Sequence, residues 1–345
     1  MYKFDSGCCV HFVGSVPLAT GAEVMRTLGG RFGRALRRVP DGETGERTNW
    51  LQFQEEVFAA SPDMETVPAK EDNRNAAAKR KQTRQFRVRP GHKVTAASFG
   101  SLGYTDSALA SWKTFSQLAA EGAVSGRFMV AVPSPYNVIS WAIADESRTE
   151  VEAAYQAKLL QEVAAICAAI PADKLAIQWD CAHDMQAFDG ARVPWFTPAK
   201  EGIIQRLAFL GDQVPAGVDM GYHLCYGSFG GKHFVEPRDA GAMVELTNGI
   251  AAALHRKLDF VHMPVPIERD DDAYYQPLAG LRVGADTELY LGLVHDKDGV
   301  EGTRKRIAVA KRHVPHFGIA SECGFGRRPV EEVPVLLDVH QQAMQ

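Results

Sequence analysis

The sequence Val-Asp-Met-Gly-Tyr-His-Leu-Cys, at residues 218–225, is the stretch from which the fold can be inferred. It is a short, mostly apolar run with the length of a buried β-strand. On an extended strand the side chains of His223 and Cys225, two positions apart, point to the same side. Similar runs occur at residues 9–13, 127–132, 174–180, 260–265, 289–294 and 317–320. Helical segments separate several of these runs, and this alternation predicts a parallel α/β sheet.

Polar residues follow several of the predicted strands directly, and their position favours one kind of α/β sheet. In a (β/α)8 barrel, the chemistry is carried by residues at the carboxyl ends of the strands. The chain has 345 residues, of which 46% are hydrophobic, which is enough for a large core. Length alone suggests about two domains, but barrels of this size often form one. We therefore predict a single TIM barrel over residues 1–345, with a basic insertion or loop around residues 70–93.

The basic segment at residues 70–93 differs in composition from the rest of the chain. It contains few apolar residues and six closely spaced cations, Lys79, Arg80, Lys81, Arg84, Arg87 and Arg89. A charge run of this kind is usually a solvated loop or helix face. The alternative interpretation is an anion-binding rim for a negatively charged substrate.

Charge and composition exclude several classes of function. The net charge of −4 gives no sign of binding to nucleic acid or to an anionic membrane. No apolar run reaches the roughly 18 residues of a membrane helix, and the first residues lack the apolar core of a signal peptide. Six cysteines in a chain this long do not make a disulfide scaffold. We therefore expect a cytoplasmic protein that binds neither nucleic acid nor membrane.

A metal site is the first functional hypothesis. Cys323 follows His223 and Cys225 by about a hundred residues and can approach them from another strand. Two thiolates and an imidazole suit zinc far better than magnesium or calcium, and three protein ligands leave a fourth position for a substrate. The alternative is that each cysteine is a small buried hydrophobe. We interpret the other cysteines in that way: Cys8, Cys9, Cys167 and Cys181.

Short motifs follow the predicted strands in a fixed order. They are Val-Gly-Ser-Val-Pro at 13–17, Pro-Asp-Gly-Glu-Thr-Gly-Glu-Arg at 40–47, Pro-Tyr-Asn-Val-Ile-Ser-Trp at 135–141, Gln-Trp-Asp at 178–180, His-Leu-Cys-Tyr-Gly at 223–227, Val-His-Asp at 294–296 and Ser-Glu-Cys-Gly-Phe-Gly-Arg-Arg at 321–328. Together they resemble the C-terminal catalytic domain of cobalamin-independent methionine synthase. That domain belongs to a superfamily of (β/α)8 barrels that also contains uroporphyrinogen decarboxylase.

The resemblance implies a set of roles for these residues. Zinc would be held by His223, Cys225 and Cys323. Asp180 would bind the amino group of the substrate, and His295 would move protons. Each of the last two also has a structural interpretation, because Asp180 could cap the next helix and His295 could be a surface histidine.

Five further residues are candidates for binding the substrate: Ser15, Glu43, Glu46, Trp141 and Arg327. Ser15 would donate to a substrate carboxylate, or would only cap a helix. The two glutamates would bind an ammonium group or the metal, or would be polar loop residues. Trp141 is either a packing residue or a stacking platform, and Arg327 would clamp a carboxylate or phosphate.

The sequence departs from the family at three points, one of which is Asp-Cys-Ala at 180–182, where the family has Asp-Glu-Pro. The family has a glutamate ligand on the strand after His-x-Cys, whereas residues 259–264 read Asp-Phe-Val-His-Met-Pro. His262 is the possible fourth ligand, Glu245 and Glu268 are other candidates, and a site with three protein ligands is also open. In addition, the resemblance of these 345 residues is to the C-terminal domain of the classical enzyme and not to its large N-terminal domain, so we expect the methyl donor to differ or to remain undetermined.

The favoured hypothesis is an enzyme that transfers a methyl or other small alkyl group through a zinc-bound thiolate. Its substrate would be a small thiol or an alkylated small molecule, and formation of a homo-oligomer is left open. The first alternative is a zinc-dependent lyase or demethylase that cleaves a C–S or C–O bond. The others are a metal-free enzyme of the decarboxylase type and a thiol- or metal-binding protein without turnover.

Overall fold

The computed structural model describes residues 9–69, 84–227 and 233–345. Within these residues, eight parallel strands form one sheet in the order β1-β10-β9-β8-β7-β6-β5-β2. The strands are β1 (Val10–His11), β2 (Arg38–Pro40), β5 (Arg127–Pro133), β6 (Leu175–Cys181), β7 (Asp219–Leu224), β8 (Phe260–Pro264), β9 (Glu288–Val294) and β10 (Gly318–Ser321). Parallel pairings of Val10 with Leu36 and of Ser15 with Gly42 join the two ends of the sheet. The predicted (β/α)8 barrel is therefore confirmed.

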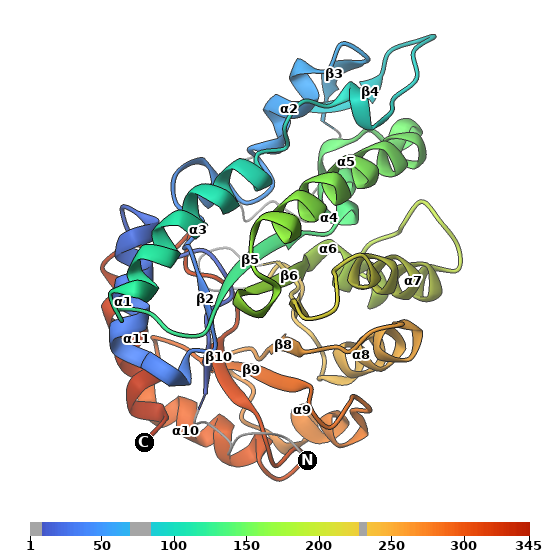
Figure 1. The fold of residues 1–345 in the computed structure, drawn as a ribbon. Coiled ribbons are helices and arrows are strands. Elements are labelled where there is room, and N and C mark those ends of the chain that lie inside the picture. The colour runs from blue at the N-terminus through green and yellow to red at the C-terminus, as the bar shows by residue number, and fades with distance from the viewer. Residues whose placement is uncertain (1–8, 70–83, 228–232) are drawn as a thin grey trace.

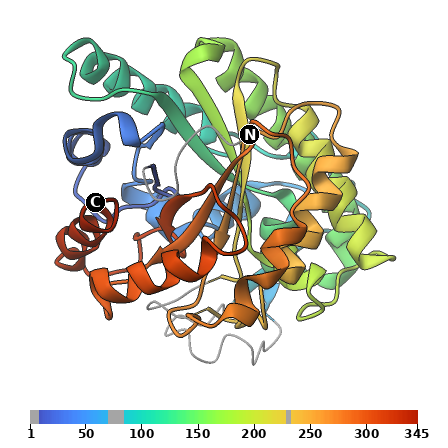
Figure 2. The ribbon, with the colours of Figure 1, turned by 90° about the horizontal axis from the view of Figure 1, so that it is seen from below.

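Helices surround the barrel, as Figures 1 and 2 show from the side and from below. The longer ones are α1 (Gly21–Phe32), α3 (Tyr104–Ala120), α5 (Arg148–Ala169), α7 (Ala199–Asp212), α8 (Gly241–Ala253), α10 (Gly299–Ala310) and α11 (Glu332–Ala343). The shorter ones are α2 (Gln54–Ala60), α4 (Pro135–Ala142), α6 (Ala182–Phe188) and α9 (Asp272–Tyr275). No described helix is long and apolar enough to cross a membrane.

Helix α4 shows how short connections place side chains at the barrel mouth. Ser134 follows β5 directly, and its hydroxyl accepts a hydrogen bond from the backbone of Asn137. Pro135 occupies the first helical position, where the missing N–H costs nothing. The chain therefore turns from strand to helix within two residues. Side chains at this point stay close to the strand ends.

The register of β6, β7 and β8 aligns three polar residues. Asp180 pairs with His223, and His223 pairs with His262. Gly221 allows β7 and β8 to approach closely, because a Cβ atom there would lie 2.3 Å from the carbonyl oxygen of Phe260. The three polar side chains are consequently held in adjacent positions across the sheet.

Strand β2 was not among the predicted strands, and its charged residue explains why. Arg38 is buried at the opposite end of the barrel from these residues. Its guanidinium donates to Glu288 at 2.7 Å and to Asp219 at 2.8 Å. A short strand with a buried, ion-paired arginine does not show the apolar pattern of a strand.

Within the described part of the basic segment, residues 84–88 form a strand, and residues 89–93 continue as a loop. Strand β4 (Arg84–Val88) pairs with β3 (Met64–Pro68) in an antiparallel hairpin. Arg84 donates to Glu55 and Glu56, and Arg87 donates to Glu65. These two arginines thus have carboxylate partners within the protein. Residues 70–83, which carry Lys79, Arg80 and Lys81, lie outside the described residues.

Candidate metal centre and active-site cavity

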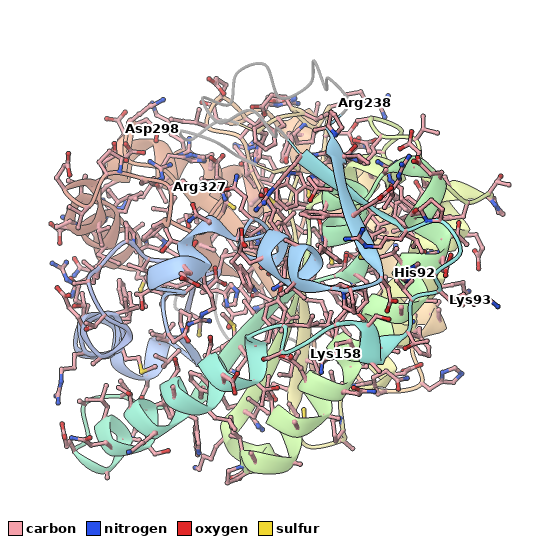
Figure 3. All side chains as sticks on the ribbon, turned by 90° about the horizontal axis from the view of Figure 1, so that it is seen from above. His92, Lys93, Lys158, Arg238, Asp298 and Arg327 are labelled. Atoms are coloured by element: carbon pink, nitrogen blue, oxygen red, sulfur yellow. The ribbon has the colours of Figure 1, made fainter. Side chains whose placement is uncertain are left out.

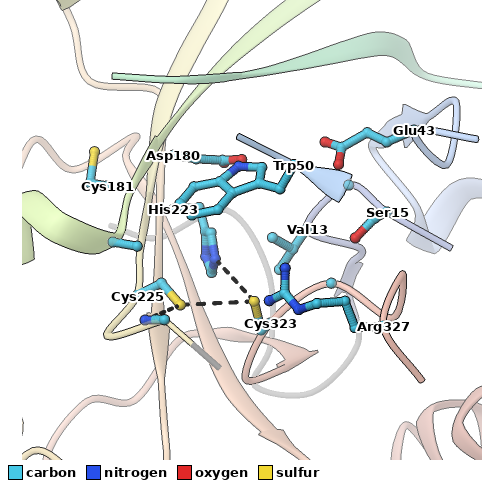
Figure 4. Close-up of a pocket in the computed structure, with 14 residues that line it drawn as sticks. Val13, Ser15, Glu43, Trp50, Asp180, Cys181, His223, Cys225, Cys323 and Arg327 are labelled. Atoms are coloured by element: carbon cyan, nitrogen blue, oxygen red, sulfur yellow. Dashed lines mark hydrogen bonds between the residues drawn. The ribbon is translucent and has the colours of Figure 1, made fainter. Parts of the chain in front are cut away.

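A cavity lies at the carboxyl ends of the barrel strands (Figure 4). The carboxyl ends of β6 and β7 contribute to its wall, together with residues that follow β1, β2, β6, β7 and β10. The lining residues are Val13, Gly14, Ser15, Glu43, Trp50, Asp180, Cys181, Ala182, His223, Cys225, Gly227, Cys323, Gly324 and Arg327. Three of the predicted metal ligands and four of the other predicted site residues therefore face one space.

His223, Cys225 and Cys323 bring three potential ligand atoms together. The atoms all lie within 4.8 Å of one another. The two sulfurs are 3.8 Å apart, and Nε2 of His223 lies 3.9 Å from Sγ of Cys323. His223 and Cys225 come from the end of β7, whereas Cys323 follows β10. The predicted convergence of these side chains is present in the fold.

The donor set fits zinc in both chemistry and spacing. Tetrahedral zinc binds thiolate sulfur at about 2.3 Å, which places two such sulfurs about 3.8 Å apart. The backbone N–H of Gly227 donates to Sγ of Cys225 at 3.1 Å, a contact that favours a thiolate. The Cys225 thiol beside Cys323 is the main cause that lowers the pKa of Cys323, and burial opposes this effect. The residues present therefore suit a thiolate-bound metal.

The candidates for a fourth ligand lie in three different places. His262 is fully buried beside His223, and its Nδ1 lies 2.7 Å from Nδ1 of that ring. Its Nε2 lies 2.9 Å from the backbone oxygen of Ser321. Glu245 pairs with Lys200 on the outer helices at 2.5 Å. Glu268 lines a separate cavity.

Asp180 is oriented by a chain of hydrogen bonds through the barrel interior. Nε2 of His11 lies 2.7 Å from Oε1 of Gln178, so the histidine N–H donates to the amide oxygen. The amide nitrogen of Gln178 then donates to Oδ1 of Asp180 at 2.9 Å. Trp50 donates a further hydrogen bond to Asp180. Burial raises the pKa of Asp180 to about 6, while His223 and the bond from Gln178 oppose the rise.

Glu43 is held in the cavity by a strained loop. Its φ angle is +47° and that of Trp50 is +43°, in the left-handed region that large side chains rarely adopt. The carboxylate packs over Gly14, where a Cβ atom would lie 2.6 Å from Oε1. Burial, and then the charge of Asp180, raise the pKa of Glu43 well above its ordinary value. Two carboxyl groups thus share one cavity wall.

Ser15 connects the end of β1 to the segment that carries Cys323. Its hydroxyl accepts a hydrogen bond from the backbone of Gly326 at 3.2 Å. Its carbonyl oxygen accepts one from Phe325 at 2.7 Å. Ser15 therefore has partners in the protein besides any substrate. Arg327, on the same segment, lines the cavity and is labelled in Figures 3 and 4.

Three other predicted site residues do not line the cavity. Glu46 is exposed on the short helix Gly45–Asn49. Trp141 lies on α4 and packs, half-buried, against the hydrophobic core. His295 is buried with its Nε2 2.9 Å from the oxygen of Val265, and burial lowers its pKa to about 3. The roles assigned to these residues stay predictions.

Two cavity residues were not recognised from the sequence. Trp50 lies in a loop between elements, and nothing in its neighbourhood indicates that it contacts Asp180. Cys181 was interpreted as structural, and its Sγ does donate to the oxygen of Trp179, yet the residue also lines the cavity. The one available signal was its position directly after a candidate site residue at a strand end.

No protein-family model matches the chain, and none of the curated proteins does. Among solved structures, one from Shewanella sp. W3-18-1 is described as a B12-independent methionine synthase in complex with selenomethionine. It matches 98% of this chain and 96% of that chain, with a TM-score of 0.60 and 14% sequence identity. The fold is similar to that of this methionine synthase. At this identity the likeness concerns the fold alone, which is the fold that the resemblance of the sequence motifs implies.

Proposed function

We propose that the protein is a zinc-dependent enzyme that transfers a methyl or other small alkyl group involving a thiol. The observation that carries the proposal is the meeting of His223, Cys225 and Cys323 on the wall of a cavity that Asp180 and Glu43 also line. Three protein ligands are the arrangement of catalytic zinc, which keeps one position for substrate. The similar fold of a chain described as a methionine synthase supports the same class of reaction.

Zinc held by these three residues would stabilise a substrate thiol as its thiolate and so supply a nucleophile at neutral pH. The protein groups have a separate task, which is to place the substrate. Asp180 and Glu43 lie close enough to raise the pKa of Glu43. A substrate ammonium beside them would relieve this repulsion, because an opposite charge favours the ionised carboxylates. We assign both residues to the amino group of a small aminothiol.

Trp50 and Arg327 complete the proposed binding site. The indole of Trp50 donates to Asp180 and covers part of the cavity, which would fix the carboxylate and exclude water. Arg327 would pair with an anionic group of the substrate, because a guanidinium binds carboxylates in a bidentate way. Protonation of the leaving group by His295 stays a prediction, because His295 does not line the cavity and burial lowers its pKa to about 3.

Cleavage of a C–S or C–O bond at the same centre is the second candidate function. One observation favours it. The carboxyl end of β8 carries no glutamate, whereas the resemblance implies a glutamate ligand there. A centre with a different ligand set is compatible with a different reaction of the same class of substrate.

The test begins with metal analysis of the purified protein, for which we expect about one zinc per chain. Cys225→Ser and Cys323→Ser should each lose most of the zinc. Cys167→Ser is the matched control, because Cys167 lies on α5 away from the cavity. Zinc-edge X-ray absorption with added homocysteine should then show one more sulfur ligand.

Turnover separates the two candidate reactions. Transfer predicts that an alkylated thiol accumulates when a methyl donor is supplied, whereas cleavage predicts that an alkylated substrate is consumed without an acceptor. Full activity of a metal-free preparation would exclude both. Consumption of substrate with no thiol entering the zinc shell would exclude transfer through a thiolate.

A further inference from the structure

The pair formed by His223 and His262 determines which nitrogen of His223 can bind a metal. The two residues are register partners on β7 and β8, and both are buried. Their Nδ1 atoms are 2.7 Å apart, a hydrogen-bond distance. Two ring nitrogens at this distance share one proton, so one donates and the other accepts.

The second nitrogen of His262 decides the direction of this bond. Nε2 of His262 lies 2.9 Å from the backbone oxygen of Ser321. A carbonyl oxygen only accepts, so Nε2 of His262 carries a hydrogen. A neutral His262 then has an unprotonated Nδ1, which accepts from Nδ1 of His223.

The opposite direction would require a doubly protonated His262. That residue is fully buried, and no carboxylate among the described residues is hydrogen-bonded to it. A buried charge without a counter-ion is costly. The neutral arrangement is therefore favoured, and it leaves the lone pair of His223 on Nε2, the atom that lies 3.9 Å from Sγ of Cys323.

We propose that His262 is a positioning residue that fixes the tautomer and ring orientation of His223, so that Nε2 of His223 is available to the metal. This inference rests on the metal centre of the proposed function and deepens it. His262 acts behind a ligand, in the role that a carboxylate or a carbonyl oxygen often has in zinc sites. The same residue also bonds to Ser321, two residues before Cys323, and so holds β7 and β10 at a fixed distance.

The proposal differs from the hypothesis that His262 is the fourth ligand. Both ring nitrogens of His262 already have partners within hydrogen-bond distance. To bind the metal, the residue would have to give up one of them. A positioning role predicts one imidazole in the zinc shell, whereas ligation predicts two.

Two substitutions separate the roles. Asn at position 262 keeps an acceptor at the δ1 position, and Leu removes it. We expect His262→Leu to weaken zinc binding about 10- to 100-fold, as loss of such a supporting contact does elsewhere. His262→Asn should recover most of this loss. His255→Asn is the matched control, because the side chain of His255 is 90% exposed.

The readouts are the zinc dissociation constant by competition with a chelator and the zinc-edge X-ray absorption spectrum. Nitrogen-15 NMR of labelled histidines reports the tautomers in the wild-type protein. This measurement does not depend on whether a variant folds. Protonated Nδ1 of His223 together with protonated Nε2 of His262 supports the proposal. Two imidazoles in the zinc shell, or unchanged zinc affinity of a folded His262→Leu, overturns it. A wild-type protein that binds no zinc instead removes the proposed function itself.

Discussion

At the scale of single residues, the site depends on supports that are distant in the sequence. His11 and Gln178 are 167 positions apart, yet their hydrogen bond fixes the amide that holds Asp180. Ser15 supports the Cys323 segment in the same way, from the first strand to the last. The carboxylate and the sulfurs are therefore placed by neighbouring side chains as well as by their own strands.

Replacing Asp180 by Asn tests its proposed role in binding. The substitution keeps the shape of the side chain and removes the charge that would pair with a substrate ammonium. We expect KM for an aminothiol to rise about 10- to 100-fold, the equivalent of a charged hydrogen bond. Zinc content should stay the same, and the unfolding midpoint should not fall, because burial already opposes ionisation of this carboxyl group. Asp173→Asn is the control, since that side chain is 73% exposed.

The same experiment can contradict the assignment in two ways. A variant that unfolds would show that Asp180 has a structural role. An unchanged KM in a folded variant would remove Asp180 from the binding site.

Some residues of the site could be predicted from the sequence, and others could not. Asp180, His223, Cys225 and Cys323 could be selected because each lies at a strand end or in a motif with ligand chemistry. Trp50 could not, because its contact with Asp180 depends on a loop whose backbone adopts φ of +43°. His262 was named as a candidate because it lies on the strand that follows His-x-Cys. The sequence does not show which side chains lie next to its ring nitrogens.

At the scale of elements, apolar patterning identified the strands whose residues are mostly hydrophobic. Strand β7 is an example, since every residue after Asp219 is buried. Strand β2 has only three residues, and its buried Arg38 pairs with Glu288 and Asp219 from other strands. An ion pair between distant strands leaves no local periodicity, so this strand could not be predicted.

Gly221→Ala tests whether close packing of β7 on β8 supports the site. A Cβ atom at this position would lie 2.3 Å from the backbone oxygen of Phe260, which cannot move without shifting β8. We expect a loss of stability of about 1–3 kcal/mol or more, measured by urea unfolding. Zinc affinity should also fall, because His223 and His262 lie on the displaced strands.

Gly30→Ala provides the matched control. An added Cβ atom there meets nothing within 4 Å, and the position is on helix α1. Alanine should raise stability by up to about 1 kcal/mol through helix propensity. Equal effects of the two substitutions would show that the approach of β7 to β8 is not tight.

At the scale of the whole molecule, the two ends of the barrel have different electrostatics. The amino-terminal end holds the ion pairs of Arg38 with Glu288 and Asp219. Arg38 keeps the pKa of Glu288 below its ordinary value despite burial. At the other end, burial raises the pKa of Asp180, Glu43 and Asp184. The nearby cations there do not offset this effect of burial, as Arg38 does for Glu288. The ion pairs stabilise the fold, whereas the carboxyl groups at the mouth oppose it when they ionise.

Asp184 allows this cost to be measured. It is fully buried at the start of α6, where Ser134 and Asn137 donate to one carboxylate oxygen at 2.7 and 2.8 Å. Burial raises its pKa from 3.8 to about 7. The folded state therefore binds the proton more tightly than the unfolded chain, and stability should fall as pH rises from about 4 to about 7. A pKa shift of this size corresponds to a loss of at most about 4 kcal/mol in the free energy of unfolding.

Asp184→Asn should remove this component, because the amide keeps an acceptor for Ser134 and Asn137 but does not ionise. Urea unfolding of both proteins between pH 4 and pH 8 gives the difference in stability at each pH. Relative to the wild type, the variant should become more stable as pH rises from about 4 to about 7. Above about pH 7 the difference in stability should be constant. The other carboxyl groups of the mouth titrate in both proteins, so they cancel from the difference. A difference that does not change with pH would mean that Asp184 is ionised in the folded protein throughout the window, and that burial at the barrel mouth does not hold its proton.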